Sequence, residues 1–150
     1  MTTLSIRRAG EPDLPAILRL YGQGGMNDED GLTVDAAAAI LRRMTAYPDY
    51  AVYVASADDG AVVGTFALLI MDNLAHGGAP SAVVEDVCVD EDLRGRGIGR
   101  AMMTHAMDHA RERGCYKLTL SSNLARGHAH AFYRALGFEQ HGISLQVTLR

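Results

Sequence analysis

Apolar residues recur with helical spacing in the first third of the chain. Four of them stand at i, i+3, i+4 and i+7, on one face of a predicted helix: Leu14, Ile17, Leu18 and Tyr21. A short strand is expected before this helix, at residues 4–9. Thr33 is suited to cap a second helix that runs from residue 34 to about residue 47 and stops at Pro48.

Strand-like stretches dominate the middle of the chain. Residues 50–57 and 61–71 flank the turn sequence Asp58-Asp59-Gly60, which predicts a hairpin, and residues 82–89 predict a further strand. The remaining expected elements are a helix at 98–113 ended by Gly114, a strand at 117–121, a helix at 127–136 ended by Gly137, and a last strand at 143–149. The order β-α-α-β-β-β-α-β-α-β predicts an α/β fold, with a mixed sheet and helices on both faces.

Composition narrows the class of protein. The 150 residues suit one domain, 1–150, and 48% apolar residues suffice for a hydrophobic core. A formal net charge of −4 argues against general nucleic-acid binding, which needs a basic face. Two cysteines, Cys88 and Cys115, lie in apolar stretches and are expected to be reduced. Without a signal-like N-terminal run or a membrane-length apolar stretch, we expect a soluble, cytoplasmic protein with no membrane partner.

Residues 90–100 join a strand to a helix and combine glycine with arginine. The alternating glycines Gly95, Gly97 and Gly99 let backbone approach a ligand closely. The start of the following helix offers unpaired N–H groups and a positive dipole end, and Arg94, Arg96 and Arg100 add positive charge. Together they predict a pyrophosphate site, with an ordinary flexible loop as the alternative. Arginine at position 100 excludes a dinucleotide fingerprint, and a Walker A loop is excluded because G-K-[ST] is absent.

Two neighbouring carboxylates interrupt the apolar strand before this loop. Because strand residues alternate between faces, we expect Glu85 on one face and Asp86 on the other. A carboxylate on a central strand is costly unless it is paired or lines a solvated cleft. A catalytic role is favoured for Glu85 and a structural role for Asp86. The alternatives are an edge strand or structural pairing with arginine or backbone N–H groups.

Other chemically suggestive residues carry less weight. Tyr133 lies in a helix beside core positions, and taken alone it is best interpreted as a core tyrosine. His105 and His109 are one helical turn apart, but no H-E-x-x-H pattern or third ligand accompanies them, so no metal site is expected. Cys88 lies on a strand, where cysteines are usually inert as nucleophiles.

The motifs together resemble the GNAT superfamily of N-acetyltransferases. Residues 94–99, Arg-Gly-Arg-Gly-Ile-Gly, are similar to the acetyl-CoA motif R/Q-x-x-G-x-G/A of that family. Phe132-Tyr133 and Leu136-Gly137-Phe138 resemble its C-terminal motif, at the correct distance. The resemblance implies an α+β fold with a mixed, mostly antiparallel sheet, and acetyl-CoA as cosubstrate. Finer similarities point to glucosamine-phosphate, diamine and aminoalkylphosphonate acetyltransferases. Because these subfamilies differ in substrate, they do not fix the acceptor.

The resemblance also implies roles for individual residues. Glu85 would act as general base and Tyr133 as general acid toward the leaving thiolate. Many family members have a cofactor-contacting asparagine seven residues before the tyrosine. Here that position holds Arg126, which could instead meet a phosphate of CoA or an acidic group of the substrate, and Asn123 stands three residues earlier. The implied cofactor-binding residues are Val87, Cys88, Val89, Arg94, Gly95, Arg96, Gly97, Ile98, Gly99, Arg100, Asn123 and Arg126.

The expected reaction is direct transfer of an acetyl group from acetyl-CoA to a primary amine in a ternary complex. A small-molecule amine is favoured as the acceptor, and loops 22–31 and 73–81 are expected to shape its pocket. Two other functions stay open: a non-catalytic acetyl-CoA-binding regulatory module, and an acetyltransferase for proteins or peptides. Family likeness, the apolar arm at 66–71 and a final strand that would otherwise form an exposed edge predict a homodimer.

Overall fold

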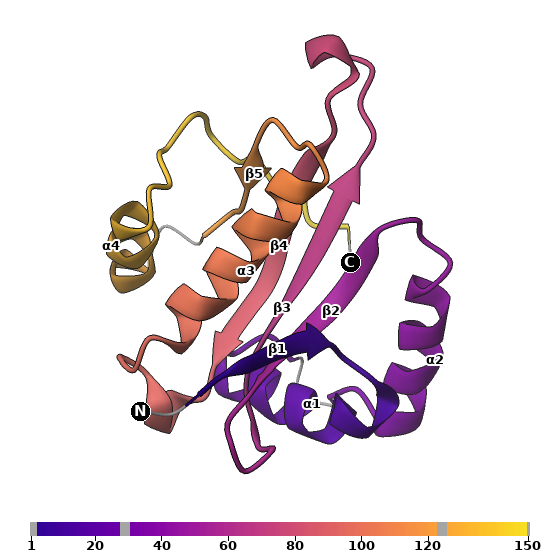
Figure 1. The fold of residues 1–150 in the computed structure, drawn as a ribbon. Coiled ribbons are helices and arrows are strands. Elements are labelled where there is room, and N and C mark those ends of the chain that lie inside the picture. Colours follow the sequence, from indigo (N-terminus) through magenta and orange to yellow (C-terminus); the bar gives the residue numbers. More distant parts are fainter. Residues whose placement is uncertain (1–2, 28–30, 123–125, 150) are drawn as a thin grey trace. The chain divides into compact units, whose positions relative to one another are not determined.

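Five strands form one sheet, in which they lie in the order of the sequence, β1-β2-β3-β4-β5, in the computed structural model (Figure 1). Neighbours from β1 to β4 are antiparallel, and β5 is parallel to β4. The bounds are β1 Ser5–Arg8, β2 Tyr50–Ser56, β3 Val62–Met71, β4 Ser81–Val89 and β5 Leu118–Thr119. The expected mixed, mostly antiparallel sheet is confirmed.

The structure describes residues 3–27, 31–122 and 126–149. Its contacts divide the chain into two compact units, Met1–Thr119 and Leu120–Arg150. The first unit holds the sheet, and the second holds the helix α4, Gly127–Ala135. None of the described helices is long and apolar enough to span a bilayer.

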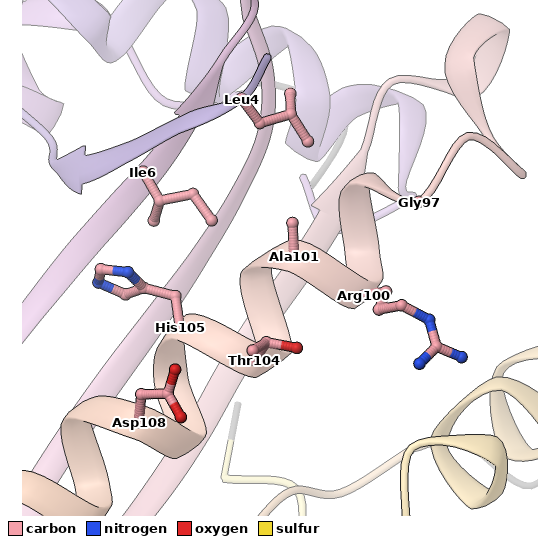
Figure 2. A pocket seen from close by; sticks show the side chains of 8 residues that line it. All are labelled: Leu4, Ile6, Gly97, Arg100, Ala101, Thr104, His105 and Asp108. Atoms are coloured by element: carbon pink, nitrogen blue, oxygen red, sulfur yellow. The ribbon is translucent and has the colours of Figure 1, made fainter. Parts of the chain in front are cut away.

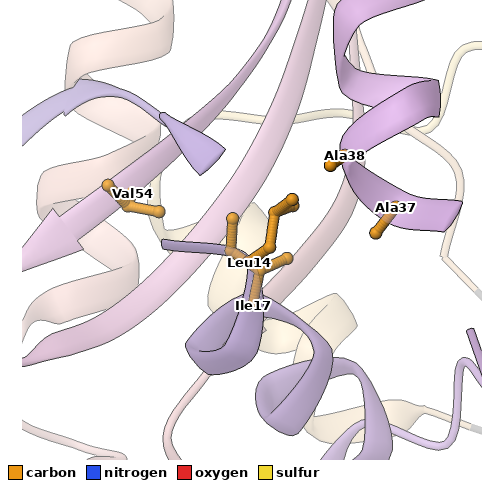
Figure 3. Close-up of a cluster of buried hydrophobic side chains, with 5 residues drawn as sticks. All are labelled: Leu14, Ile17, Ala37, Ala38 and Val54. Carbon is orange, nitrogen blue, oxygen red and sulfur yellow. The ribbon is translucent and has the colours of Figure 1, made fainter. Parts of the chain in front are cut away.

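Helices cover both faces of the sheet in the first unit. They are α1 Leu14–Gln23, α2 Val34–Met44 and α3 Ile98–Glu112, with short 3-10 turns at Glu11–Asp13, His76–Gly78 and Glu91–Leu93. Neighbouring residues of β2 point to opposite faces. Val54 packs against α1 and α2 in a buried cluster with Leu14, Ile17, Ala37 and Ala38 (Figure 3). Tyr53 instead contacts the rings of His105 and His109 on α3.

The predicted cap of α2 and the predicted turn between β2 and β3 are confirmed. The hydroxyl of Thr33 accepts a hydrogen bond from the N–H of Ala36 (3.2 Å), and so caps α2 as predicted. At the predicted hairpin, Gly60 has φ = 83°, and its N–H donates to the carbonyl of Ala57 (2.9 Å). A left-handed residue is inexpensive there because glycine has no Cβ.

The predicted last strand at 143–149 is wrong. The structure places these residues in no strand, and the alternating apolar side chains are 76–90% exposed: Ile143, Leu145, Val147 and Leu149. Alternation describes the side chains of a strand, but a strand also needs a hydrogen-bonded neighbour, and none of the described strands pairs with this segment. The strand expected at 117–121 is likewise shorter than predicted, since β5 is confined to Leu118–Thr119.

Candidate active site

A bulge interrupts β4 at its two acidic residues. The register with β3 shifts between two pairs, Ala67 with Glu85 and Thr65 with Cys88. Asp86 lies inside the shift and has φ = 53°, a left-handed conformation that is uncommon for a residue with a side chain. An extra residue breaks the alternation of faces, and the structure leaves both Glu85 and Asp86 exposed. The regular alternation expected along this strand is therefore wrong at Asp86.

The edge of β4 that faces β5 is unpaired over most of its length. Within the described part of the first unit, β5 pairs with β4 at Ala82 and Val83. From Glu85 to Val89, β4 therefore has β3 as its one strand neighbour among the described residues. An unpaired edge can bind an extended ligand through main-chain hydrogen bonds. Residues 87–89 thus have the geometry that pairing with a pantetheine arm requires, and that pairing stays a prediction.

Glu85 lies where its charged form is disfavoured. Partial burial raises the pKa of Glu85 above its ordinary value, and the negative charge of Asp86 raises this pKa further. A carboxylate with a raised pKa takes up a proton more readily, as a general base must. The electrostatics therefore favour a proton-accepting role for Glu85 at the edge of β4.

Two tyrosines near these acids were not expected to belong to the site. Burial raises the pKa of Tyr21 on α1, and the charge of Asp86 adds to this shift. Burial also raises the pKa of Tyr50 on β2, with further contributions from Asp86 and Glu85. Both phenols therefore remain protonated at neutral pH and can donate hydrogen bonds. Sequence patterns place these tyrosines on a helix and a strand, but do not show which residues the fold brings beside them.

The loop after β4 has the open backbone that its glycines predict. Gly95 and Gly97 have φ values of 78° and 84°, and a Cβ added at either would meet no atom within 4 Å. Gly97 directly precedes α3, and no side chain of the described residues caps that helix. The first N–H groups of α3 are therefore left for water or an anionic ligand.

The other predicted cofactor-binding residues of this loop divide by exposure. Arg94, Arg96 and Arg100 are exposed, so positive charge surrounds the loop. The side chain of Ile98 is buried. It packs closely against Gly64 on β3, where an added Cβ would lie 3.1 Å from the Cγ2 atom of Ile98. Gly99 is half-buried in the first turn of α3. Ile98 can therefore meet a ligand through its backbone alone.

A groove of about 520 Å³ adjoins the loop on the side of β1 (Figure 2). Its lining combines apolar side chains near β1 with polar side chains along α3: Leu4, Ile6, Gly97, Arg100, Ala101, Thr104, His105 and Asp108. No sequence pattern predicts this groove, because its two walls are about ninety residues apart in the chain. It gives a ligand held at Gly97 or Arg100 a further concave surface to contact.

The remaining predicted site residues lie in the second unit. Tyr133 on α4 is half-buried, and its ring packs edge-on against those of Phe132 (5.1 Å between centroids) and Phe138 (5.6 Å). Arg126 is exposed and directly precedes α4, where its carbonyl accepts a hydrogen bond from the N–H of His130 (3.2 Å). Asn123 lies outside the described residues. The roles of Tyr133 and Arg126 therefore rest on the sequence motif.

Histidine side chains contribute packing in the first unit. His105 and His109 lie 5.5 and 6.4 Å from the ring of Tyr53, measured between centroids. His109 also lies 3.7 Å from the buried carboxylate of Asp49. Across the described parts of the chain, no three histidine, cysteine or acidic side chains are arranged to hold a metal ion.

Comparison with known proteins identifies the family. A model of the acetyltransferase (GNAT) family matches residues 24–138. Over 90 residues the chain is 34% identical to glucosamine 6-phosphate N-acetyltransferase of Trypanosoma brucei brucei, covering 60% of this chain and 59% of that protein. It is 31% identical over 102 residues to aminoglycoside N(6')-acetyltransferase type 1 of Stenotrophomonas maltophilia, covering 67% of each chain.

Solved structures share the fold over nearly the whole chain. A protein of Agrobacterium tumefaciens str. C58 superposes with a TM-score of 0.89 at 38% identity, covering 96% of this chain and 99% of that one. Glucosamine-6-phosphate N-acetyltransferase from Arabidopsis thaliana has a TM-score of 0.85 at 22% identity, with 99% of each chain covered, and supports the fold alone.

The fold, the loop before α3 and the family match together define the class of protein. The chain belongs to the acetyltransferase (GNAT) family. It is an N-acetyltransferase by class: the acetyl donor is acetyl-CoA, and the acceptor is an amine. The two relatives act on different amines by name, so family membership leaves the acceptor of this chain open.

Proposed function

We propose that this chain, acting as one acetyltransferase domain over residues 1–150, acetylates the primary amine of a small molecule by direct attack on acetyl-CoA. The observation that carries the proposal is Glu85, an exposed carboxylate with a raised pKa at the unpaired edge of β4. The curated relatives support a small acceptor, because they are named for an amino sugar phosphate and an aminoglycoside.

A base is needed because the acceptor arrives charged. An alkylamine with a pKa of about 10.4 is neutral only about once in 2,500 molecules at pH 7. Glu85 is proposed to take the proton of the ammonium group, through water, as the nitrogen attacks the thioester carbonyl. The protonated phenols of Tyr21 and Tyr50 interact electrostatically with Asp86, and we propose them as hydrogen-bond donors to the acceptor.

Direct attack is preferred over an acetyl-cysteine intermediate because of where Cys88 lies. Cys88 is buried, and its Sγ lies 3.6 Å from the Sδ of Met26. A buried thiol is protected from reaction, and the thiolate that would attack is disfavoured away from water. A direct reaction requires both substrates to be bound together, so initial-rate lines at varied amine and acetyl-CoA should intersect. Parallel lines would contradict it.

The cofactor is proposed to lie along β4 and the loop that follows. Residues 87–89 would pair with the pantetheine arm, and the amides between Leu93 and Arg100 would bind the pyrophosphate. The exposed side chains of Arg94, Arg96 and Arg100 support this by placing positive charge around the loop. Asn123 and Arg126 are proposed to add contacts to the cofactor, Arg126 through a phosphate.

A panel of amines tests the proposed activity. Purified protein is incubated with acetyl-CoA and single amines, among them glucosamine 6-phosphate, aminoglycosides, diamines and N-terminal peptides, and release of CoA is followed with a thiol reagent. Turnover of one small-amine class is expected. Turnover of peptides alone would favour the protein or peptide acetyltransferase, and binding of acetyl-CoA without turnover of any amine would favour the regulatory module.

Tyr133→Phe tests the proposed general acid. The substitution keeps the ring between Phe132 and Phe138 and removes the hydroxyl. Loss of a general acid typically costs ~10²–10⁴ in rate, and we expect the lower end, because a thiol of pKa ~8.5 is already a fair leaving group. Steady-state kinetics should show kcat reduced up to about 100-fold, with acetyl-CoA affinity unchanged. An unaltered kcat would contradict the assignment.

The chain is further proposed to be a cytoplasmic homodimer. Its two cysteines in 150 residues are typical of a reducing compartment. Dimerisation is supported by the segment 143–149, whose apolar side chains are 76–90% exposed in the single chain. Several exposed apolar side chains in a short segment without a strand partner favour association with another chain.

Light scattering tests the dimer. At micromolar concentration the mass should be twice the 16.1 kDa of one chain. Leu145→Asp should lower this mass, because a charge would be buried in the proposed contact. Leu74→Asp is the matched control, since Leu74 is also fully exposed but lies outside the segment. A monomeric wild-type chain would refute the dimer.

A further inference from the structure

The last turns of α1 bind the start of the loop that follows β4. Arg19 and Gln23 are four residues apart and lie on one face of the helix. The Nη1 of Arg19 donates to the Oδ2 of Asp90 (2.9 Å). One turn later, the Oε1 of Gln23 accepts a hydrogen bond from the backbone N–H of Glu91 (3.1 Å). Two consecutive residues of the loop are therefore held by one helix that is about seventy residues distant in the chain.

Asp90 is the residue that sets the path of the loop. Its N–H donates to the carbonyl of Val63 on β3 (2.9 Å), and its carbonyl accepts from the N–H of Leu93 (2.9 Å). Its Oδ1 accepts from the N–H of Asp92 (3.1 Å), while its Oδ2 bonds to Arg19. Both carboxylate oxygens are therefore used, one inside the turn and one toward α1. The direction in which the chain enters Gly95 and Gly97 follows from this turn.

The end of α1 is firmly fixed against the sheet. Ile17 and Leu20 are 2% and 1% exposed. At Gly24, which follows the helix, an added Cβ would lie 2.9 Å from the Sγ of Cys88 on β4. The backbone at the helix end therefore packs directly against the side chain of Cys88, and it can serve as a support for Asp90 and Glu91.

Charge gives Arg19 a second effect on this loop. Three acids immediately precede the proposed pyrophosphate site: Asp90, Glu91 and Asp92. Their negative charges would repel the negatively charged pyrophosphate. The hydrogen bond from Arg19 lowers the pKa of Asp90, so the carboxylate stays ionised and keeps its cationic partner. Arg19 thereby offsets one of the three negative charges.

We propose that Arg19 and Gln23 are positioning residues for the pyrophosphate of acetyl-CoA. They act through Asp90 and Glu91, which hold the loop amides and the start of α3 in the orientation that binds phosphate. The inference rests on the proposed placement of the cofactor at residues 93–100. It assigns to α1 a function in cofactor binding, in addition to its place in the core.

Binding measurements with two donors test this inference. Calorimetry with acetyl-CoA should show a Kd raised about threefold to tenfold in Arg19→Ala and in Gln23→Leu. Arg19→Ala removes the hydrogen bonds to Asp90 and to the carbonyl of Val62, and Gln23→Leu removes the bond to Glu91. Arg19→Lys should recover part of the loss. S-acetyl-pantetheine, which lacks the pyrophosphate, should bind wild type and variants equally when its affinity is measured by ligand-observed NMR.

The controls separate positioning from general destabilisation. Arg42→Ala removes a comparable exposed ion pair, Arg42–Glu11 (2.6 Å), and should leave both affinities unchanged. Unchanged acetyl-CoA affinity in the Arg19 and Gln23 variants would overturn the inference. So would equal losses for the two donors, or a loss in Arg42→Ala. Gly97→Glu is measured alongside. Normal acetyl-CoA binding by Gly97→Glu would contradict the proposed placement of the cofactor itself. Weak binding by Gly97→Glu together with unchanged binding by the Arg19 and Gln23 variants would contradict this inference alone.

Discussion

Replacing Glu85 with glutamine is expected to lower kcat by about 10²- to 10⁴-fold at neutral pH, the usual cost of losing a general base. Glutamine has nearly the same shape as glutamate but cannot accept the proton of the ammonium group. Because Glu85 is exposed and the substitution leaves its backbone unchanged, the melting temperature should change little. Affinity for acetyl-CoA, measured by calorimetry, should stay near that of wild type.

The pH dependence gives a second, independent sign of the same role. A general base must be deprotonated, so wild-type activity should fall as pH decreases through the pKa of Glu85. Burial and the charge of Asp86 raise that pKa, so the loss should occur at a higher pH than for an ordinary glutamate. Glu85→Gln should lack this acidic limb, and its defect should shrink as pH rises and more amine is already neutral.

Asp86→Asn is the matched control for Glu85→Gln. Both substitutions remove one negative charge from adjacent residues of the bulge. Asparagine also tolerates the left-handed conformation that Asp86 adopts at φ = 53°, so the backbone is not disturbed. A much smaller kcat effect is expected for Asp86→Asn. If Asp86→Asn were the inactive variant and Glu85→Gln retained activity, the base would be Asp86 and the assignment of Glu85 would be wrong.

Features with local causes could be predicted from the sequence. Thr33 caps α2, and Gly60 turns the β2–β3 hairpin, because each effect depends on a few adjacent residues. Gly95 and Gly97 adopt positive φ values in the open loop before α3, as the spacing of glycine suggested.

Features that depend on pairing between distant segments could not be predicted. The bulge at Asp86 is a property of the register between β3 and β4. The bulge interrupts the alternation of side chains between the two faces of β4 that the apolar pattern implies. No residue type in the strand indicates where the bulge lies. The prediction of a last strand at 143–149 was wrong for a related reason. Leu145 and Val147 have the spacing of a strand, but no described strand pairs with this segment.

The site residues that sequence reasoning missed belong to α1 and β2. Tyr21 has the spacing of a core position, yet burial near Asp86 gives its phenol a raised pKa. Gln23 lies in a glycine-rich stretch that predicts only a loop, yet it binds the N–H of Glu91, 68 residues later. Such contacts arise from the packing of α1 on the sheet, and a single sequence contains no local sign of them.

Gly97→Glu is expected to weaken acetyl-CoA binding by at least ~100-fold, measured by calorimetry. Two costs combine at this residue. Gly97 has φ = 84°, where a side chain adds roughly 1–2 kcal/mol of strain. The new carboxylate would also lie at the uncapped start of α3, where it would compete with the pyrophosphate for the same N–H groups and repel its charge. Each ~1.4 kcal/mol corresponds to a tenfold change in affinity, so strain alone would not account for a 100-fold loss.

Gly60→Glu separates the two costs. Gly60 has φ = 83°, nearly the value at Gly97, and a Cβ added there likewise meets no atom within 4 Å. The substitution therefore introduces the same strain and the same charge, but at the hairpin between β2 and β3 and away from the start of α3. It should lower the melting temperature about as much as Gly97→Glu while leaving acetyl-CoA affinity unchanged. Comparable affinity losses in the two variants, or a folded Gly97→Glu protein that binds acetyl-CoA normally, would show that the pyrophosphate does not bind at this loop.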